Sequence, residues 1–346
     1  MRSRRLLMLA VISVIALALP VNAASSDSLP EGAIPLAGGG YALELSAPTP
    51  AWYTPELHQR ILDAGAAGVP IPSDADIPAS GLAFTGIRPG AWMFFPAWCT
   101  MNFVFGGATA APATEAGASA LDLAPKNDKE PGGGKGQGGG SGGTKGPKAD
   151  SGSGGGAGSG WYIGTAGHCT EVGDEVTLIA APGLLMNIGR TVKSYNDEIG
   201  RDFALIEIYP EMVQYVNPSM TYWGGPTATA QPAIGDPVVH AGHGAVVGTG
   251  GTPRAGIVTY VGDGDQSSGE TAYGWDGVAS LGDSGSGVRH ASGPAVGNLT
   301  HLVVGTEYVP AFIAGTTAPY MEQLAGAPIC YAPLTPNPLP APACAS

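Results

Sequence analysis

Short apolar, β-prone segments recur along most of the chain, and glycines and prolines separate them. This pattern is typical of many short strands, so it predicts an all-β barrel or sandwich. The expected strands after residue 160 cover 161–165, 175–180, 203–209, 237–240, 245–248, 256–261 and 299–305. Towards the end of the chain, residues 318–324 show helical periodicity with a proline near the first turn, which predicts a short terminal helix.

The chain ahead of these strands has a different composition. Residues 24–90 are rich in Ala, Pro and Gly and contain a single helix-like patch at 55–62. We expect residues 24–85 to form a loosely structured leader, either a propeptide or an extension wrapped on the surface, and of the two we favour a propeptide. An aromatic, β-prone run over 92–105 then opens the main domain, which we expect to cover residues 86–332.

Two low-complexity segments interrupt and end this domain. Residues 107–160 almost lack large apolar side chains, and 131–160 are mostly Gly, Ser and Lys. Such a segment buries too little apolar surface to offset the entropy of ordering, so we expect a flexible insertion. Residues 333–346 form a Pro-rich tail of irregular structure.

The first 23 residues have the three parts of a secretory signal. Three arginines precede an apolar run over 6–20, and the small residues Val21 and Ala23 lie at the −3 and −1 positions of a cleavage site after Ala23. An uncleaved membrane anchor is the rival interpretation, but the run is short for a span. The sequence therefore predicts a secreted, extracellular protein.

The net charge limits the expected binding partners, and the cysteine count predicts disulfides. The net charge is −13, so electrostatics do not favour binding to nucleic acid or to an anionic membrane surface. The four cysteines are Cys99, Cys169, Cys330 and Cys344. An even count in an oxidising compartment predicts two disulfides, for which three pairings are possible.

A serine between glycines lies in residues 281–287, which read Leu-Gly-Asp-Ser-Gly-Ser-Gly. Glycines allow a sharp turn and a close approach to the backbone, so Ser284 would lie at an exposed tip. Neighbouring backbone N–H groups would then point at whatever its hydroxyl attacks. On its own, this string is equally typical of a Gly/Ser-rich surface turn.

Two further motifs precede it in the chain. The expected strand that starts at Trp161 ends in Thr-Ala-Gly-His-Cys, which places His168 at a strand end. Residues 201–208 read Arg-Asp-Phe-Ala-Leu-Ile-Glu-Ile and contain Asp202, although Asp197 is a nearby competitor. Each residue alone could be structural, but three motifs in the order His, Asp, Ser favour a common site.

These three motifs resemble those of chymotrypsin-like (trypsin-fold) serine proteases, particularly the secreted bacterial members. The resemblance implies two Greek-key β-barrels with the active site in the cleft between them and a short C-terminal helix. It makes His168 the general base, Asp202 its orienting partner and Ser284 the nucleophile, with the N–H groups of Gly282 and Ser284 as the oxyanion hole. It also implies a monomer with no metal or cofactor.

The resemblance extends to the disulfides and the substrate pocket. It pairs Cys99 with Cys169 and so leaves Cys330 with Cys344. By position, Val278 lies at the base of the primary pocket, and Leu299, Thr300 and His301 lie along its wall. No acidic residue lies there to bind Lys or Arg, so an apolar preference is expected, with a preference for Glu through His301 as the alternative.

One feature of the family pattern is missing. In vertebrate relatives a freed N-terminus pairs with the aspartate matching Asp283, but this chain has no clear activation site. Arg88 and Arg254 are the candidate partners in its place.

The sequence therefore predicts a secreted serine endopeptidase that acts on protein or peptide substrates through an acyl-enzyme. A non-catalytic binding protein on the same fold and a serine esterase with the same triad remain the alternatives.

Overall fold

A computed structural model describes residues 29–36, 39–75, 77, 85–106, 159–244, 253–262, 271–305, 311–335 and 344. The predicted signal peptide, most of the Gly-rich insertion, the expected strand at 245–248 and most of the Pro-rich tail lie outside these residues. Within them, no helix combines the length and apolar character needed to span a membrane.

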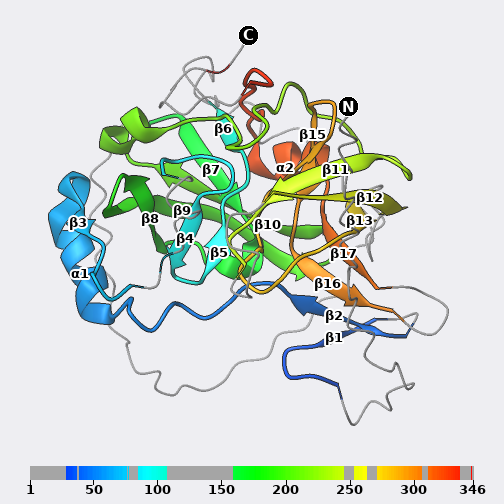
Figure 1. Cartoon of the computed structure of the whole chain (residues 1–346), viewed down its shortest axis with the longest axis horizontal. Coiled ribbons are helices and arrows are strands. Elements are labelled where there is room, and N and C mark those ends of the chain that lie inside the picture. Colours follow the sequence, from blue (N-terminus) through cyan, green and yellow to red (C-terminus); the bar gives the residue numbers. More distant parts are fainter. Residues whose placement is uncertain are drawn as a thin grey trace, which may run out of the picture.

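Two curled antiparallel sheets form the body of the molecule (Figure 1). The first has the strand order β5 (Cys99–Thr100), β4 (Trp92–Phe95), β8 (Glu175–Ala181), β9 (Leu184–Glu198), β10 (Arg201–Ile208), β7 (Trp161–Thr165) and β6 (Val104–Gly106), with β3 (Val69–Pro70) paired to β9. The second has the order β1 (Ile34–Pro35), β2 (Tyr41–Glu44), β16 (His301–Val304), β17 (Phe312–Thr316), β13 (Ala272–Asp276), β12 (Pro253–Gly262), β11 (Pro237–Ala241), β14 (Gly287–His290) and β15 (Ala295–Asn298).

Helices are few in the described part of the chain. The α-helices are α1 (Pro55–Ala64) and α2 (Ala318–Ala325), and short 3-10 turns occur at η2 (Gly65–Ala67), η5 (Gly167–Cys169) and η6 (Pro210–Tyr215). The all-β fold class and the short C-terminal helix expected from the sequence are confirmed, and the two expected β-barrels correspond to the two curled sheets, each of which forms a half-barrel.

Strand β10 shows how the residue pattern builds the core. Phe203 and Leu205 point to one side and join a cluster with Met321 of α2, whereas Ile206 and Ile208 join the interior cluster of the first sheet. Because successive side chains of a strand point to opposite faces, a nearly continuous apolar run is buried on both sides. Strand β10 is therefore held between α2 and the first sheet's core.

The Gly-rich insertion connects two neighbouring strands of the first sheet. Strands β6 and β7 pair antiparallel, with Val104 opposite Ile163 and Gly106 opposite Trp161. Residues 107–158 thus connect two strands that pair as in a hairpin. A long connection at such a site is tolerated because the closure entropy grows only logarithmically with length.

The N-terminal extension differs from the expected loose leader. Its described part contains β1, β2, α1, η2 and β3. Helix α1 starts at a cap in which the Leu57 N–H donates to Thr54 Oγ1 (3.2 Å), and it buries Leu57 and Ile61 against Trp92 and Phe94. The Ala- and Gly-rich composition is misleading because a few apolar residues at helical spacing are enough to dock the segment.

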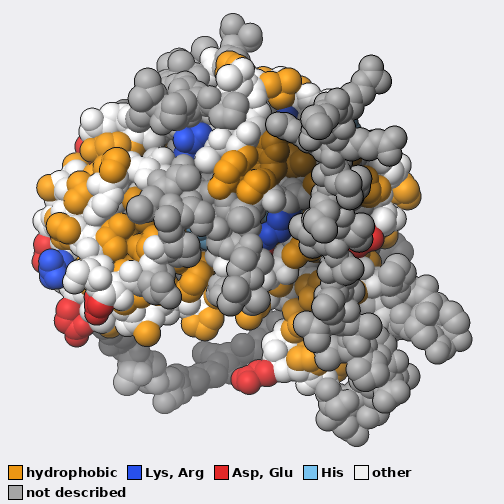
Figure 2. Space-filling view, in the orientation of Figure 1, with side chains coloured by type: hydrophobic (Ala, Val, Ile, Leu, Met, Phe, Trp, Pro, Cys, Tyr) orange, Lys and Arg blue, Asp and Glu red, His pale blue; other side chains and the backbone are white. Residues whose placement is uncertain are grey.

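Charged side chains are sparse among the described residues of one face of the molecule. On the face drawn in Figure 2, the acidic and basic side chains of the described residues lie singly or in small groups among apolar and uncharged ones.

Candidate active site

His168 lies on the short turn η5, directly after strand β7. Gly167 is required before it, because a Cβ at that position would lie 1.8 Å from the Tyr195 carbonyl oxygen of the neighbouring strand β9. The backbone N–H groups of Gly167 and His168 both donate to Asp202 Oδ1. The local chain therefore binds the carboxylate through its backbone as well as through the imidazole.

Asp202 lies near the start of β10, and residues of the second sheet hold its backbone. Asn298 Nδ2 donates to the Asp202 carbonyl oxygen (3.0 Å), and the Asp202 N–H donates to Thr316 Oγ1 (3.1 Å). The competing carboxylate, Asp197, is about half exposed and forms an ion pair with Arg201 (2.8 Å). Asp202 is thus the carboxylate that the fold brings to His168.

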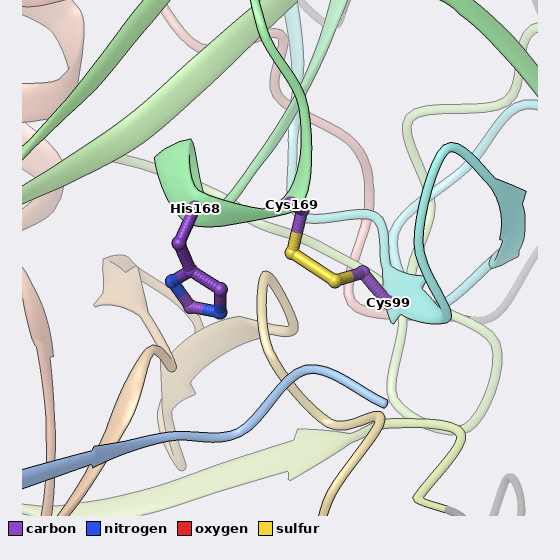
Figure 3. Close-up of side chains that lie close together, drawn as sticks. All are labelled: Cys99, His168 and Cys169. Carbon is purple, nitrogen blue, oxygen red and sulfur yellow. A yellow bond between two sulfur atoms is a disulfide. The ribbon is translucent and has the colours of Figure 1, made fainter. Parts of the chain in front are cut away.

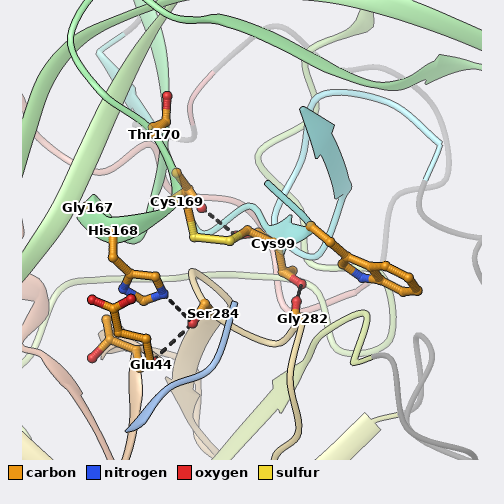
Figure 4. Close-up of a disulfide and its surroundings, with 12 residues drawn as sticks. Glu44, Cys99, Gly167, His168, Cys169, Thr170, Gly282 and Ser284 are labelled. Carbon is orange, nitrogen blue, oxygen red and sulfur yellow. Dashed lines mark hydrogen bonds between the residues drawn. A yellow bond between two sulfur atoms is a disulfide. The ribbon is translucent and has the colours of Figure 1, made fainter. Parts of the chain in front are cut away.

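The three predicted catalytic side chains form one hydrogen-bonded chain. His168 Nδ1 lies 2.6 Å from Asp202 Oδ2, and His168 Nε2 lies 2.7 Å from Ser284 Oγ. The Ser284 hydroxyl is also 3.0 Å from the Thr300 carbonyl oxygen. Figure 4 shows the contact between His168, which comes from the first sheet, and Ser284, which comes from a turn of the second.

Burial and charge act in opposite directions on this pair. Burial disfavours the charged imidazolium of His168, but the charge and hydrogen bond of Asp202 outweigh it, so the pKa of His168 is raised. Burial likewise favours the neutral acid of Asp202, but His168 and the surrounding hydrogen bonds hold the pKa of Asp202 below its ordinary value. The site is thus built to stabilise a negative Asp202 beside a positive His168.

The turn around Ser284 depends on two glycines with positive φ. Gly282 has φ 99° and Gly285 has φ 90°, and a Cβ on Gly285 would lie 2.1 Å from the Thr100 carbonyl oxygen. The N–H groups of Gly282 and Ser284 converge on a single acceptor, the carbonyl oxygen of Leu45, at 2.5 and 3.2 Å. These two predicted donors therefore act together on one carbonyl group of the chain itself.

Asp283 is paired within the fold. Its buried carboxylate accepts a hydrogen bond from Arg254 Nη1 (2.5 Å) and another from the Ser280 N–H (2.7 Å). The other candidate, Arg88, instead donates to the Ser219 carbonyl oxygen. Arg254 thus supplies the positive charge beside Asp283.

The residues assigned to the substrate pocket separate into two groups. Leu299, Thr300 and His301 are buried next to His168 and Ser284, and the His301 ring meets His168 edge-on at 5.7 Å between ring centroids. Val278, by contrast, is 51% exposed, and its carbonyl oxygen faces His240 Nε2 at 3.2 Å. The assignment of Val278 to the pocket base stays a prediction.

Both disulfides have the expected pairing. The Cys99–Cys169 bridge has a Cα–Cα distance of 6.3 Å, and Cys330–Cys344 has one of 5.0 Å. In Figure 3, the side chains of His168 and Cys169 leave the same short turn in different directions, and the bridge from Cys169 fastens that turn to Cys99 of β5.

Two groups of side chains near His168 contain types that bind metals. Cys99 and Cys169 lie beside His168, but their sulfurs are joined to each other. The second group is Glu44, His168 and His301, in which both ring nitrogens of His168 already bind Asp202 and Ser284. Neither group therefore offers a free set of ligands.

The sequence missed several residues around the site. Asn298 and Thr316 hold Asp202, and Thr100 fixes the Ser284 turn by donating to the Gly282 carbonyl oxygen (2.9 Å). No local motif marks such residues, because their role depends on chain segments distant in sequence. Leu45 and Glu44 were also missed, since the leader was not expected to enter the site.

Comparison with known proteins gives matches to solved structures alone. No protein-family model matches the chain, and no curated protein matches it. The chain is similar to Cellulomonas bogoriensis chymotrypsin, with 16% identity and a TM-score of 0.39, over 73% of this chain and 100% of that one. It is also similar to Thermobifida fusca protease A, with 15% identity and a TM-score of 0.39, over 71% of this chain and 97% of that one.

A third match is a glutamic acid specific serine protease, described as using a histidine triad in substrate binding. It has 16% identity and a TM-score of 0.34, over 49% of this chain and 86% of that one. At such identities and TM-scores the matches do not specify an activity. The chain thus resembles bacterial serine proteases of known structure, and what it does must be argued from its own side chains.

Proposed function

We propose that this protein is a serine endopeptidase that hydrolyses peptide bonds through His168, Asp202 and Ser284. The single observation that carries the proposal is the unbroken chain of hydrogen bonds from Asp202 through His168 to the Ser284 hydroxyl, at 2.6 and 2.7 Å. A base, its orienting carboxylate and a nucleophile within hydrogen-bond distance are what acyl transfer to a serine requires.

The mechanism follows from these positions. His168 Nε2 takes the proton of Ser284 as the hydroxyl oxygen attacks the carbonyl carbon of the peptide bond. Asp202 holds the proton on Nδ1 and stabilises the imidazolium that forms. The imidazolium then donates its proton to the departing amine, and water hydrolyses the acyl-enzyme by the same steps in reverse order.

The oxyanion of each tetrahedral intermediate needs preorganised donors. The N–H groups of Gly282 and Ser284 already converge on one carbonyl oxygen, so the backbone needs no rearrangement as negative charge develops there. The buried ion pair of Arg254 with Asp283, which lies between these donors in the sequence, supports the same turn.

We also propose that the enzyme is exported. The basic and apolar N-terminal signal over residues 1–23 supports export, and the two disulfides are typical of proteins that fold outside the reducing cytosol.

A fluorophosphonate probe tests the proposal, because it reacts with an activated serine nucleophile. After export from an expression host, the wild-type protein should be labelled at Ser284, as located by peptide mapping, and it should hydrolyse peptide substrates. The Ser284→Ala variant should do neither. Hydrolysis of esters without peptides would favour an esterase, and a folded protein that neither labels nor hydrolyses would favour a binding protein.

A further inference from the structure

The N-terminal extension crosses the catalytic residues in an extended conformation. Strand β2 pairs antiparallel with β16, with Glu44 opposite His301 and Leu43 opposite Leu302. One residue further along, the Leu45 N–H donates to the Thr300 carbonyl oxygen (3.0 Å). The segment that approaches Ser284 is therefore held as an added strand, which is how extended peptides bind to the edge of a sheet.

The chain on the other side of Leu45 is held as well. The Ala47 N–H donates to the Trp98 carbonyl oxygen (3.0 Å), and the Trp98 N–H donates to the Ala47 carbonyl oxygen (2.9 Å). Trp98 directly precedes Cys99, whose disulfide fastens the His168 turn. The peptide bond between Leu45 and Ser46 is thus fixed from both sides, once by the second sheet and once by the first.

The carbonyl group of Leu45 lies where the carbonyl of a substrate would lie when a serine attacks it. The Leu45 carbonyl oxygen accepts both proposed oxyanion donors, the N–H groups of Gly282 and Ser284. Ser284 is fully buried, so an external substrate has no access while this segment is in place. Figure 4 shows the segment beside Ser284, with Glu44 close to His168.

The side chain of Leu45 occupies a matching apolar environment. It is 4% exposed and belongs to the core cluster of the second sheet together with Leu299, Tyr273 and Trp275. Leu43, two residues earlier in the same extended segment, is only partly buried and is not part of this cluster. Of the two leucines in the segment, Leu45 is therefore the one whose side chain this apolar cluster binds.

We infer that residues 41–47 are the enzyme's own first substrate and that it cleaves its Leu45–Ser46 bond, with Leu45 in the primary specificity pocket. The inference rests on the proposed function. It assigns to the processed enzyme a preference for peptides with leucine, or an apolar side chain of similar size, on the acyl side of the cleaved bond.

The reaction balances with water as its only co-reactant. Ser284 Oγ bonds to the Leu45 carbonyl carbon as its proton passes to His168 Nε2. The Leu45–Ser46 C–N bond breaks, and the proton moves from His168 to the Ser46 nitrogen. Water then displaces Ser284 from the ester through the same base, which leaves a free carboxylate on Leu45 and a free amine on Ser46.

The test follows the N-termini of the full chain exported from an expression host, by mass spectrometry and N-terminal sequencing. We expect the wild type to acquire a new N-terminus at Ser46 and the Ser284→Ala variant to stay joined there. Leu45→Asp would bury an unpaired charge in the apolar environment, so cleavage should slow at least 100-fold. Leu43→Asp is the matched control in the same extended segment and should slow it less than about 5-fold.

Three outcomes would overturn the inference. They are an N-terminus elsewhere, a Leu45–Ser46 bond that stays intact in the wild type, and Leu45→Asp being cleaved at the wild-type rate. If the wild type is intact and unreactive, fluorophosphonate labelling of folded Leu45→Asp distinguishes two failures. Labelling would mean that Ser284 is active and the segment is an uncleaved inhibitor, whereas no labelling would mean that the proposed function has failed too.

Discussion

Two parts of the N-terminal extension are bound to the protein in different ways. Residues 41–47 are held beside Ser284 by backbone hydrogen bonds to Thr300, Gly282 and Trp98 and by the buried side chain of Leu45. Helix α1 is held by buried side chains, among them Leu57 and Ile61, against the aromatic residues of β4. In Figure 1 the blue chain runs from β2, near the β1 edge of the second sheet, to α1 on the other side of the molecule.

This difference in binding is what we expect if residues 41–47 are a substrate and α1 is a structural element. Backbone hydrogen bonds accept many sequences, so sequence specificity in the first part depends mainly on the one buried side chain of Leu45, whereas α1 is fixed by several buried apolar side chains. Cleavage between the two parts would release residues up to 45 and leave α1 on the mature protein. We therefore propose that the leader expected over residues 24–85 consists of two units, with the boundary at Leu45.

Asp202→Asn should have the largest effect on the cleavage of residues 41–47, and it should leave α1 unaffected. The substitution should lower the rate of cleavage at Leu45–Ser46 by about 10⁴-fold, because the imidazole loses both its orientation and its stabilising charge. Residues 41–47 should stay bound and α1 packed. The rate is measured from the time course of the new N-terminus.

The matched control for this change is Asp197→Asn. Asp197 lies five residues earlier and forms an exposed ion pair with Arg201, so its loss should leave the rate nearly unchanged. Equal rates for the two variants would argue against Asp202 as the catalytic carboxylate.

The second part is tested by Ile61→Ala in α1. Ile61 is fully buried, so its truncation should lower the free energy of unfolding by about 2–5 kcal/mol while cleavage at Leu45–Ser46 keeps its rate. Urea denaturation measures the first quantity and N-terminal sequencing the second. Leu62→Ala, at a partly buried neighbour, should cost less stability. A parallel loss of cleavage would mean that α1 helps to hold the substrate segment.

A change of one pH unit should alter the activity less than Asp202→Asn does. His168 must be neutral to act as base, and Asp202 raises its pKa, so activity should fall about tenfold per pH unit below a pKa that lies above the ordinary 6.5. The processed enzyme is assayed with a leucyl p-nitroanilide between pH 5 and 9. An activity limb well below pH 6.5 would contradict the assignment.

Stability has to be monitored in the same experiment. Burial lowers the pKa of both His240 and His243 to about 3, so the folded protein keeps them neutral while the unfolded chain takes up protons below pH 6.5. Their contribution to stability is therefore fully present above pH 6.5 and is lost progressively as pH falls towards 3. Circular dichroism at each pH separates this loss from the titration of His168.

The sequence predicted what is encoded locally. Strand ends, the turn glycines and the triad motifs lie within a few neighbouring residues, and the motif order singled out the two side chains that hydrogen-bond to the His168 ring. The helix-like patch at 55–62 was also found, since α1 has a capping threonine and an early proline.

The missed features depend on contacts between distant segments. Thr316 and Asn298 reach Asp202 across 114 and 96 residues of chain, and nothing in their local sequence distinguishes them. Leu45 was missed because backbone hydrogen bonds, which any residue can make, bring it to the site.

The disulfides have a topological consequence for any further cut in the backbone. Cys99 and Cys169 are 70 residues apart, and the loop that their bond closes contains the whole insertion between β6 and β7. A nick anywhere inside that loop yields two chains that remain one covalent molecule and separate only on reduction. The bond between Leu45 and Ser46 lies outside both disulfide loops, so a cut there gives two pieces joined by no covalent bond. Gels run with and without reductant would therefore tell a nicked molecule from a processed one.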